Sequence, residues 1–285
     1  MEVDLGGSRF DITTRSLVMG ILNRTPDSFF DQGGYYRFDE FLTKAEQLVI
    51  DGADLLDVGG VKAGPGDEVS EAEELDRVVP AIEALCARFD VPVSVDTWRA
   101  SVAKAAYGVG AVVGNDISGF ADPEYLSVAA AAGAAVVATH IRLAPRVPDP
   151  DPVYDDVVEA VVSFCAERAA LAERAGIPRE RIMVDAGLDL GKSEPQSLEL
   201  LRASAALVAL GYPVLLSASN KRFLGVLLEL EVGERRQATI AAHALGITLG
   251  CRILRAHDVK GARRTADVLA ALLEARLGSE AEEPA

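Results

Sequence analysis

The sequence predicts a single (β/α)8 barrel, the TIM-barrel fold, and three observations lead to this prediction. Eight short apolar runs alternate along the chain with amphipathic segments of helical length. Each run is almost continuously hydrophobic, which is typical of strands buried on both faces of a parallel sheet. Each run also ends in a polar residue, at the position where a barrel presents its functional groups. The second choice is a doubly wound parallel sheet, which shows the same alternation of strand and helix.

The expected elements follow one another without a linker or a break in composition. The eight strands are expected at 16–23, 53–60, 91–97, 111–118, 134–140, 181–187, 212–219 and 251–258. Between them, segments such as 41–50, 71–89 and 158–176 have apolar residues at helical spacing. A glycine directly before the next strand is the usual stop of a helix. Such glycines stand at Gly52, Gly110, Gly133, Gly211 and Gly250.

One domain is therefore expected. The barrel should span 16–277, after an N-terminal extension (1–15) and before an acidic, disordered tail (278–285). The 285 residues are 49% hydrophobic and 25% charged, as in ordinary globular proteins. The net charge of -16 argues against a nucleic-acid-binding or anionic-membrane surface. No apolar run approaches ~20 residues and the N-terminus has no signal-peptide core, so we expect a cytoplasmic protein.

The polar residues at the strand ends predict a ligand site. In barrels, the carboxyl ends of the strands and the loops after them build the active site on one face. The starts of the same strands are apolar or small, so the polar residues are not scattered at random. The residues concerned are Asn23, Asp57, Asp96, Asn115 with Asp116, His140, Asp185, Ser219, and Arg255 with His257.

Two cations and a histidine in the last quarter of the chain indicate an anion site. Arg255 and His257 are two residues apart, so on a strand their side chains point to the same face. A guanidinium and an imidazole that converge at a barrel mouth suit a phosphate or diphosphate. Lys221 lies at an expected helix start, where backbone N–H groups add positive potential. The alternative is an arginine paired with a local acid and a histidine that lines the core.

A second set of residues suits a heterocycle. Asp96, Asn115 and Asp185 end the third, fourth and sixth expected strands. Two ring N–H donors match two carboxylate oxygens, so this set fits a ligand with an amino-amidine edge, such as a pterin or guanine. The alternative is that one or more of these side chains cap the following helix, as Asp often does after a strand.

Seven sequence blocks resemble the dihydropteroate synthase family in their order along the chain. The likeness runs from about residue 16 to 272, and the first block is the most specific, because the strand ends in Asn and opens a Thr-Pro-Asp-Ser-Phe loop. The blocks are GILNRTPDSFFDQGG, LLDVGG, SVDTWRASVA, GNDISG, VDAGLDLGK, SASNKRFLG and RILRAHDV.

The resemblance implies a reaction and a role for each matched position. Members of that family condense hydroxymethyl-dihydropterin diphosphate with p-aminobenzoate, and they commonly form homodimers. The resemblance implies that Asn23 ligates the magnesium that accompanies the diphosphate. It also implies that Arg255 and His257 hold the diphosphate. The pterin would be held by Asp96, Asn115, Asp185 and Lys221.

The loop after the second expected strand departs from the family pattern. The family usually has Gly-Gly-x-Ser-Thr-Arg-Pro-Gly, whereas the Ser, Thr and Arg positions here hold Lys62, Ala63 and Gly64. The flanking glycines and the Pro-Gly pair remain, so the loop can still form. The hydroxyls and the guanidinium that organise the second substrate and the diphosphate in the family are gone, and Lys62 supplies a charge but no bidentate fork.

Two further departures fall on the p-aminobenzoate half of the pocket. The usual Ser-Arg-Lys is Ser219-Asn220-Lys221, which removes an arginine. The usual Gly-Phe-Gly-Lys has Asp189 and Leu190 in its first two positions, which removes an aromatic wall and adds a carboxylate that would repel an anionic acceptor. At about 1–3 kcal/mol for each lost contact, three or four losses would remove most useful turnover.

The sequence therefore predicts an inactive or functionally diverged paralogue that retains a pterin and diphosphate pocket. Its expected ligands are a pterin or pterin diphosphate, phosphate-type anions, and sulfonamide- or sulfone-like mimics of p-aminobenzoate. The first alternative is an active dihydropteroate synthase in which Lys62, Arg24 or Arg142 substitutes for the lost groups. The third reading is a barrel of the methyl-tetrahydrofolate-binding type. His140 is expected to be a wall of the pocket and His243 to be helix packing.

Overall fold

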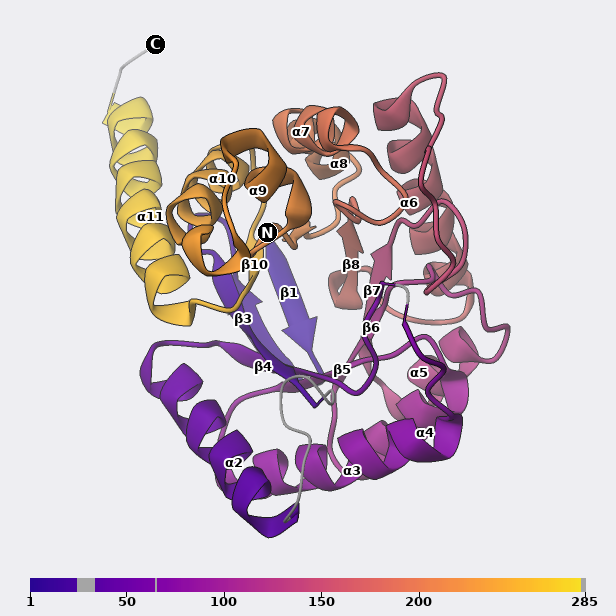
Figure 1. Cartoon of the computed structure of the whole chain (residues 1–285). Helices are drawn as coiled ribbons and strands as arrows, with labels where there is room; N and C mark the ends of the chain where they lie inside the picture. Colours follow the sequence, from indigo (N-terminus) through magenta and orange to yellow (C-terminus); the bar gives the residue numbers. More distant parts are fainter. Residues whose placement is uncertain (25–33, 65, 283–285) are drawn as a thin grey trace.

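Eight parallel strands form a closed barrel in the structure, a computed structural model that describes residues 1–24, 34–64 and 66–282 (Figure 1). The sheet order is β8-β7-β6-β5-β4-β3-β10-β9, so the last strand pairs with the first, and a parallel bridge between Val184 and Val214 joins the two ends of this order. The TIM-barrel prediction is confirmed, and the doubly wound sheet is excluded because such a sheet is open. The strands are β3 (Leu17–Asn23), β4 (Leu55–Gly59), β5 (Val93–Asp96), β6 (Val113–Asp116), β7 (Ala135–Thr139), β8 (Ile182–Asp185), β9 (Leu215–Leu216) and β10 (Ile253–Ala256).

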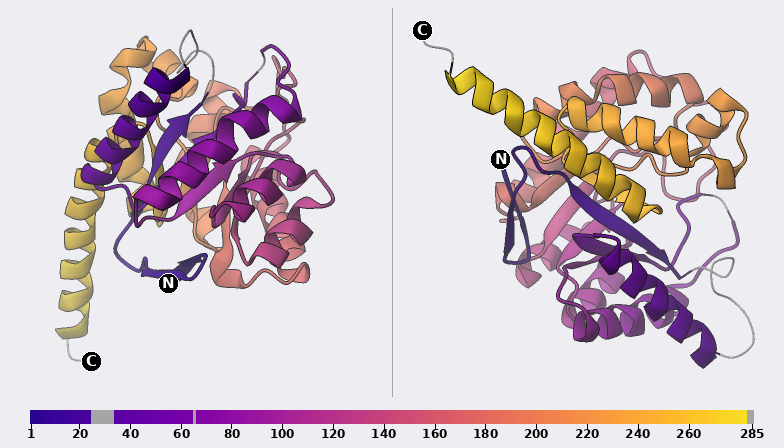
Figure 2. Two further views of the ribbon diagram at one scale, coloured as in Figure 1. Left: turned by 90° about the horizontal axis from the view of Figure 1, so that it is seen from below. Right: turned by 90° about the vertical axis from the view of Figure 1, so that its left-hand side faces the viewer.

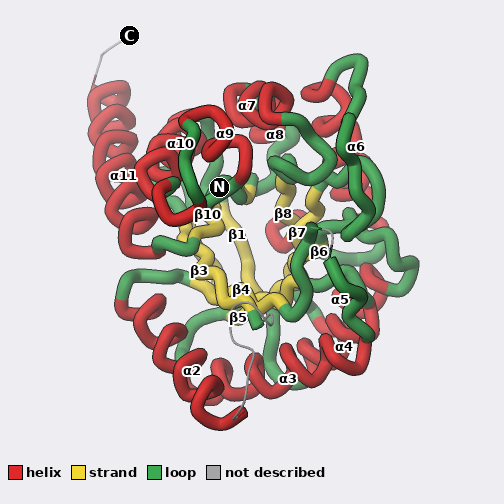
Figure 3. The backbone as a smooth tube through the Cα atoms, viewed as in Figure 1, coloured by secondary structure: helices red, strands yellow, loops and turns green. Residues whose placement is uncertain are grey.

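The helices surround the strands as an outer ring (Figure 3). Their starts are fixed by capping residues where the sequence offers them: Ser70 accepts from the Glu73 amide at α3, and Ser193 forms a reciprocal capping box with Gln196 at α7. All five expected stop glycines have positive φ angles, as the left-handed stop requires. The helices are α2 (Gly34–Ile50), α3 (Glu71–Arg88), α4 (Ala100–Gly108), α5 (Tyr125–Ala132), α6 (Val157–Arg174), α7 (Glu194–Arg202), α8 (Ser204–Val208), α9 (Arg222–Leu228), α10 (Arg236–Thr248) and α11 (Val259–Glu282).

The N-terminal extension closes one end of the barrel. It forms an antiparallel hairpin of β1 (Glu2–Leu5) and β2 (Ser8–Asp11), which lies across the barrel in Figures 1 and 2. Val3, Leu5 and Ile12 are buried in the cluster of apolar side chains that fills the barrel interior, among residues from the strand starts. This packing leaves the opposite end, where the strands finish, as the open mouth.

The C-terminal helix is longer than expected. Its backbone runs through Glu282, past the domain boundary expected at residue 277, because Ala, Leu, Glu and Arg favour helix. Residues 278–282 thus continue α11 where a disordered tail was expected, and 283–285 lie outside the described residues. No helix in the described part of the chain is long and apolar enough to cross a membrane.

Candidate functional site

Arg255 stands at the centre of the barrel mouth, between two carboxylates. Its Nε donates to Asp57 Oδ2 at 2.7 Å, and its Nη2 donates to Asp96 Oδ2 at 2.6 Å. Asn115 joins the same cluster, because its Nδ2 donates to Asp57 Oδ2 at 3.2 Å. The strand ends β4, β5, β6 and β10 therefore bring these four side chains together, as the position of polar residues along the sequence predicted.

Burial shifts the pKa of one carboxyl group of this cluster, Asp96, towards neutral pH. Burial raises the pKa of Asp96 to about 7, against the opposing effect of Arg255 and with a further contribution from the carboxylates of Asp57 and Glu74. The two neighbouring acids in turn raise the pKa of Arg255, so its guanidinium stays charged. Two carboxylates share one cation here, and the cluster can exchange a proton near pH 7.

Asp185 and Lys221 border the cluster from the far side of the mouth. One oxygen of Asp185, Oδ1, accepts from the Gly187 amide at 2.8 Å. That turn needs glycine, because Gly187 has a φ of 63° and a Cβ there would lie 1.9 Å from the His140 carbonyl oxygen. Burial raises the pKa of Asp185 and lowers the pKa of Lys221, and the two opposite charges counteract both shifts.

His257 lies at the exposed rim of the mouth and contacts neither Asp57 nor Asp96. Ser219 Oγ lies 3.0 Å from His257 Nδ1 and also accepts from the His257 backbone amide at 3.1 Å. Although the ring reaches solvent, desolvation at the mouth and the cations Arg255, Lys44 and Lys221 lower the pKa of His257 to about 4. A cavity of about 400 Å³ opens beside it, lined in part by Ser219, Asn220, Arg236 and Thr239. Arg255 and His257 thus have different partners. The Arg255 guanidinium is paired with carboxylates, as in the alternative given for this arginine in the sequence analysis, and His257 contacts Ser219.

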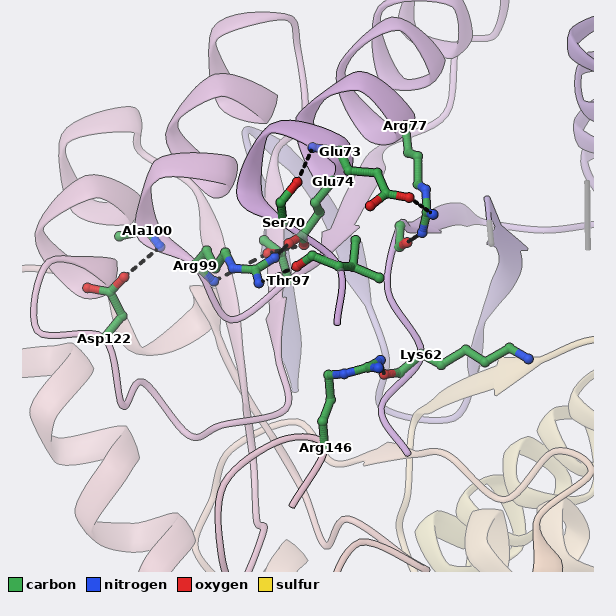
Figure 4. A network of polar contacts seen from close by, with 12 residues as sticks. Lys62, Ser70, Glu73, Glu74, Arg77, Thr97, Arg99, Ala100, Asp122 and Arg146 are labelled. Carbon is green, nitrogen blue, oxygen red and sulfur yellow. Dashed lines mark hydrogen bonds and ion pairs between the residues drawn. The ribbon is translucent and has the colours of Figure 1, made fainter. Parts of the chain in front are cut away.

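The β4–α3 loop (residues 60–70) is held by arginines that come from outside it (Figure 4). Arg77 of α3 donates to the Gly60 carbonyl at 2.7 Å. Arg146, in the loop after β7, donates through Nη1 to the Lys62 carbonyl at 3.1 Å, through its backbone amide to the Ala63 carbonyl at 3.2 Å, and through Nη2 to the Asp67 carbonyl. The carbonyls of Gly60, Lys62, Ala63 and Asp67 are therefore held by arginines, and positions 62–64 lack the side chains that the family usually has there.

A buried carboxylate links the end of this loop to the strand that carries Asp96. Glu74 is fully buried and accepts from Thr97 Oγ1 at 2.6 Å and from Arg99 Nη1. Arg99 also donates to the Val69 carbonyl at 2.8 Å, so one guanidinium joins the loop to the Glu74 carboxylate (Figure 4).

Two of the cations considered as substitutes for the lost loop arginine are already engaged. The Arg24 guanidinium lies over the rings of Phe38 and Phe41, at 5.1 and 5.2 Å from the centroids. Arg142 forms a bidentate pair with Asp149, with both distances 2.6 Å. Residues 25–33, which include the Thr-Pro-Asp-Ser-Phe loop, lie outside the described residues.

The β8–α7 loop (residues 186–193) is fixed by a buried lysine. Lys192 Nζ donates to the carbonyls of Gly187 and Leu190 at 2.9 and 3.0 Å, and it lies 2.8 Å from His140 Nδ1. Burial and the nearby ammonium lower the pKa of His140 to about 3. A histidine with so low a pKa is neutral and a weak base, so the structure supports the expectation of a pocket wall.

Asn23 ends β3 on the same side of the mouth as Asp96. A Cβ built on Gly59 would lie 3.5 Å from both Asn23 Oδ1 and Asp96 Oδ2, so the two oxygens flank this glycine. Among the residues that the structure describes, no group of three or more His, Cys, Asp or Glu side chains is arranged to hold a metal ion.

Comparison with known proteins places the chain in a family. A family model of pterin binding enzymes matches residues 19–257. The chain belongs to this family. It is 42% identical to the dihydropteroate synthase of Bacillus subtilis, over 91% of this chain and 89% of that protein. It is equally, 42%, identical to inactive dihydropteroate synthase 2 of Mycobacterium tuberculosis strain H37Rv, over 90% of this chain and 83% of that protein.

Solved structures agree with this assignment. The Yersinia pestis dihydropteroate synthase in complex with a sulfonamide drug superposes with a TM-score of 0.89 at 36% identity, over 96% of this chain and all (100%) of that one. The Xanthomonas albilineans dihydropteroate synthase with 4-aminobenzoic acid gives a TM-score of 0.87 at 38% identity, over 95% of this chain and 98% of that one.

In this member of the pterin binding enzyme family, three sets of contacts at the mouth could not be predicted from the sequence. Asp57 was noted as a strand end but received no role, and its fully buried carboxylate accepts from both Arg255 and Asn115. Its other oxygen, Oδ1, has no hydrogen-bond partner among the described residues. Arg146 contacts the β4–α3 loop from the loop after β7, and Asp189 Oδ2 accepts from the Arg222 amide at 2.5 Å. Both contacts join segments that are distant in the sequence, and no local pattern signals them.

Proposed function

We propose that this chain binds a pterin, or the diphosphate ester of a hydroxymethyl-dihydropterin, and condenses it with p-aminobenzoate weakly or not at all. The proposal rests mainly on a difference between the two halves of the mouth: the residues expected to bind the pterin are retained, whereas those expected to bind p-aminobenzoate are replaced. Asp96, Asn115, Asp185 and Lys221 stand together at the strand ends, whereas the β4–α3 loop has no hydroxyl or guanidinium at 62–64. A chain without any function would have accumulated substitutions in both halves of the site to the same extent.

The pterin half offers the groups that an amino-amidine edge needs. Asp185 uses one oxygen for the Gly187 amide, which leaves its second oxygen for a ligand N–H. The Lys221 ammonium has no side-chain hydrogen-bond partner among the described residues, and it suits a ring carbonyl or a phosphate oxygen. Asp96 and Asn115 present a carboxylate and an amide on the neighbouring strands β5 and β6.

The diphosphate would lie towards His257 and Ser219, where the cavity beside the rim opens. Asn23 would hold the accompanying magnesium, because Mg²⁺ is usually bound through few protein oxygens together with substrate phosphates. When bound, the ion would neutralise charge on the diphosphate oxygens. Arg255 would act mainly by setting the charge of Asp57 and Asp96, since its donors already meet these carboxylates.

The condensation itself asks little acid–base chemistry of the protein. The bond between the pterin methylene carbon and the diphosphate oxygen breaks, and diphosphate leaves with the electron pair. The acceptor amine forms the new C–N bond and releases one proton to the departing diphosphate or to water. Loop order and charge stabilisation decide the rate, and positions 62–64 of the β4–α3 loop carry none of the hydroxyl or guanidinium groups that the family usually has there.

The second candidate is an active dihydropteroate synthase. The identity of 42% to the Bacillus subtilis enzyme favours it as much as the same identity to the inactive mycobacterial relative favours the first. Against it, Arg24 and Arg142 are engaged elsewhere. Lys62 remains the replacement that the loop itself offers.

Calorimetry and a steady-state assay distinguish the two candidates. We expect wild type to bind a pterin and diphosphate, and Asp185→Asn to weaken pterin binding by at least about tenfold, because it replaces one acceptor of the pterin N–H groups. Asp155→Asn, at the exposed rim, is the control and should leave the affinity unchanged. Family-typical turnover with p-aminobenzoate would establish the second candidate, and absence of pterin binding by wild type would contradict both.

We also propose that two copies of the chain associate through α10 and α11. The exposed side chains Leu245, Val268 and Leu272 lie on these helices. Sedimentation at micromolar concentration tests this, and a Val268→Glu, Leu272→Glu variant should be monomeric if wild type is a dimer.

A further inference from the structure

The carboxylate of Asp189 bridges two loops of the mouth. It lies in the β8–α7 loop and accepts from the backbone amides of the first two residues of α9, with Oδ2 at 2.5 Å from the Arg222 nitrogen and Oδ1 at 3.3 Å from the Phe223 nitrogen. Its own backbone amide donates to Ser197 Oγ at 3.2 Å, so the residue is held from both sides. Asp189 has a φ of 65°, in the left-handed region.

This arrangement neutralises a positive region of the mouth. Lys221 precedes α9, and its ammonium and the amides behind it were expected to attract the negative charge of a ligand. Instead, Asp189 makes the largest of the carboxylate contributions that keep the pKa of Lys221 from falling further on burial. The two amides already have an anionic partner, and Asp185 supplies a second carboxylate near the same lysine.

We propose that Asp189 sets the acceptor specificity of this site, by excluding amines that carry a carboxylate and favouring uncharged arylamines. The proposal rests on the proposed function, in which the mouth binds a pterin diphosphate and an amine. A carboxylate that enters between the β8–α7 loop and the start of α9 meets a fixed like charge and no free amide. An uncharged amide or sulfonamide at the same place is not repelled by the Asp189 carboxylate and does not need a backbone amide to stabilise a negative charge.

The chemistry of the transfer is unchanged by this choice of acceptor. The amine nitrogen forms the bond to the pterin methylene carbon, diphosphate leaves with the electron pair of the broken C–O bond, and one amine proton is released. The substituent opposite the amine takes part in no bond change. Asp189 therefore acts on acceptor binding and is a specificity residue, not a catalytic one.

Two substitutions separate the charge of Asp189 from its structural role. Asn and Gly both tolerate the left-handed backbone, so neither Asp189→Asn nor Asp189→Gly adds strain. Asn keeps a side-chain oxygen that accepts from the α9 amides but removes the charge, whereas Gly removes both. Asp151→Asn is the matched control, because it removes a negative charge from the exposed rim without touching α9.

The experiment compares p-aminobenzoate with p-aminobenzamide, which differ in the charge of one substituent. Each is titrated into wild type and the three variants by calorimetry, with and without the pterin diphosphate, and thermal unfolding is recorded in parallel. We expect wild type to bind the amide at least about tenfold more tightly than the acid. Asp189→Asn should reduce the ratio of the two affinities at least about fivefold, and Asp189→Gly should reduce this ratio further. The control Asp151→Asn should leave the ratio unchanged.

The outcomes that overturn the proposal are distinct from those that overturn the proposed function. An unchanged preference in Asp189→Asn, with or without loss of thermal stability, shows that Asp189 is only a helix cap. Equal affinity of wild type for the two acceptors, or no binding of either acceptor to any of the four proteins, also overturns it. A pterin that fails to bind contradicts the proposed function alone, because the titrations without pterin still report the preference.

Discussion

Asp57, Asp96 and Arg255 show how single residues set the chemistry of the mouth. A buried charge is costly unless it is paired, and here one guanidinium serves two carboxylates. Asp57 is fully buried and also accepts from Asn115, whereas the side chain of Asp96 keeps 15% of its surface exposed. Asp96 is therefore the more accessible of the two carboxylates, and under the proposed function its pKa of about 7 makes pterin binding depend on pH.

The first prediction concerns this pH dependence. A carboxylate accepts two ligand N–H groups only when it is ionised, so pterin affinity should fall as pH falls through the pKa of Asp96 at about 7. Between pH 8 and pH 6 the ionised fraction, and with it the affinity, should drop by about tenfold. Fluorescence titration of a pterin at a series of pH values measures this.

Asp96→Asn is the control, because it removes the titrating group and leaves any titration of the pterin itself. We expect this variant to bind more weakly and to lose the step near pH 7. A wild-type affinity that does not change between pH 6 and pH 8 would contradict the assignment of Asp96 as a pterin acceptor.

At the scale of elements, the strands were predictable and the loop contacts were not. Each of the eight barrel strands falls within its expected run, because continuous apolar stretches and glycine stops are local signals, whereas the hairpin of β1 and β2 was not expected. Only β9 is much shorter than its run 212–219: Pro213 has no N–H, and its carbonyl accepts from Val184 where the barrel closes. Arg146 reaches the β4–α3 loop from about 80 residues away, a contact that depends on the closed barrel.

The site shows the same division. Because polar residues at the carboxyl ends of barrel strands lie at the mouth, the sequence correctly predicted that Asp96, Asn115 and Asp185 lie there. It did not reveal that Arg255 is shared between two acids, because the partner of a buried cation depends on packing. The sequence indicated that the Asp189 carboxylate would repel an anionic acceptor. It did not reveal that this carboxylate accepts from the backbone amides at the start of α9.

The second prediction restores the β4–α3 loop. Gly64 has no positive φ and no atom within 4 Å of a Cβ built on it, so a side chain can start there without a clash. The variant Lys62→Ser, Ala63→Thr, Gly64→Arg should raise turnover with p-aminobenzoate by about tenfold or more, and further when combined with Asp189→Gly. Asn220→Arg is tested separately, because Asn220 has a φ of 56° and arginine is strained in that region.

Single-turnover rates with saturating pterin diphosphate measure the effect. Arg146→Ala in the restored background serves as the control for the loop contacts. It should lower the gain because it removes the guanidinium contacts to the Lys62 and Asp67 carbonyls, while the backbone amide of residue 146 still contacts the Ala63 carbonyl. No gain in the restored variant, with pterin binding intact, would show that the loop groups are not what limits turnover.

At the scale of the whole molecule, the apolar packing of the hairpin and the proposed site occupy opposite ends of the barrel. The N-terminal hairpin packs into the barrel interior at the strand starts, whereas the polar cluster lies where the strands end. Barrels commonly divide these tasks between their two faces. Asp4 strengthens the closed end, because its Oδ2 accepts from Arg181 Nη2 at 2.9 Å and the side chain is almost fully buried.

The third prediction follows from this division. Leu5 is 1% exposed, so Leu5→Ala should lower the free energy of unfolding by about 2–5 kcal/mol. Because the hairpin shares the interior cluster with the strands, we expect one cooperative urea transition at a lower midpoint, and pterin affinity at the opposite end should be unchanged. Ile50→Ala, at an exposed site at the end of α2, is the control and should change stability by less than about 0.5 kcal/mol. An unchanged midpoint for Leu5→Ala, or an early separate transition, would mean that the hairpin unfolds independently and does not close the barrel.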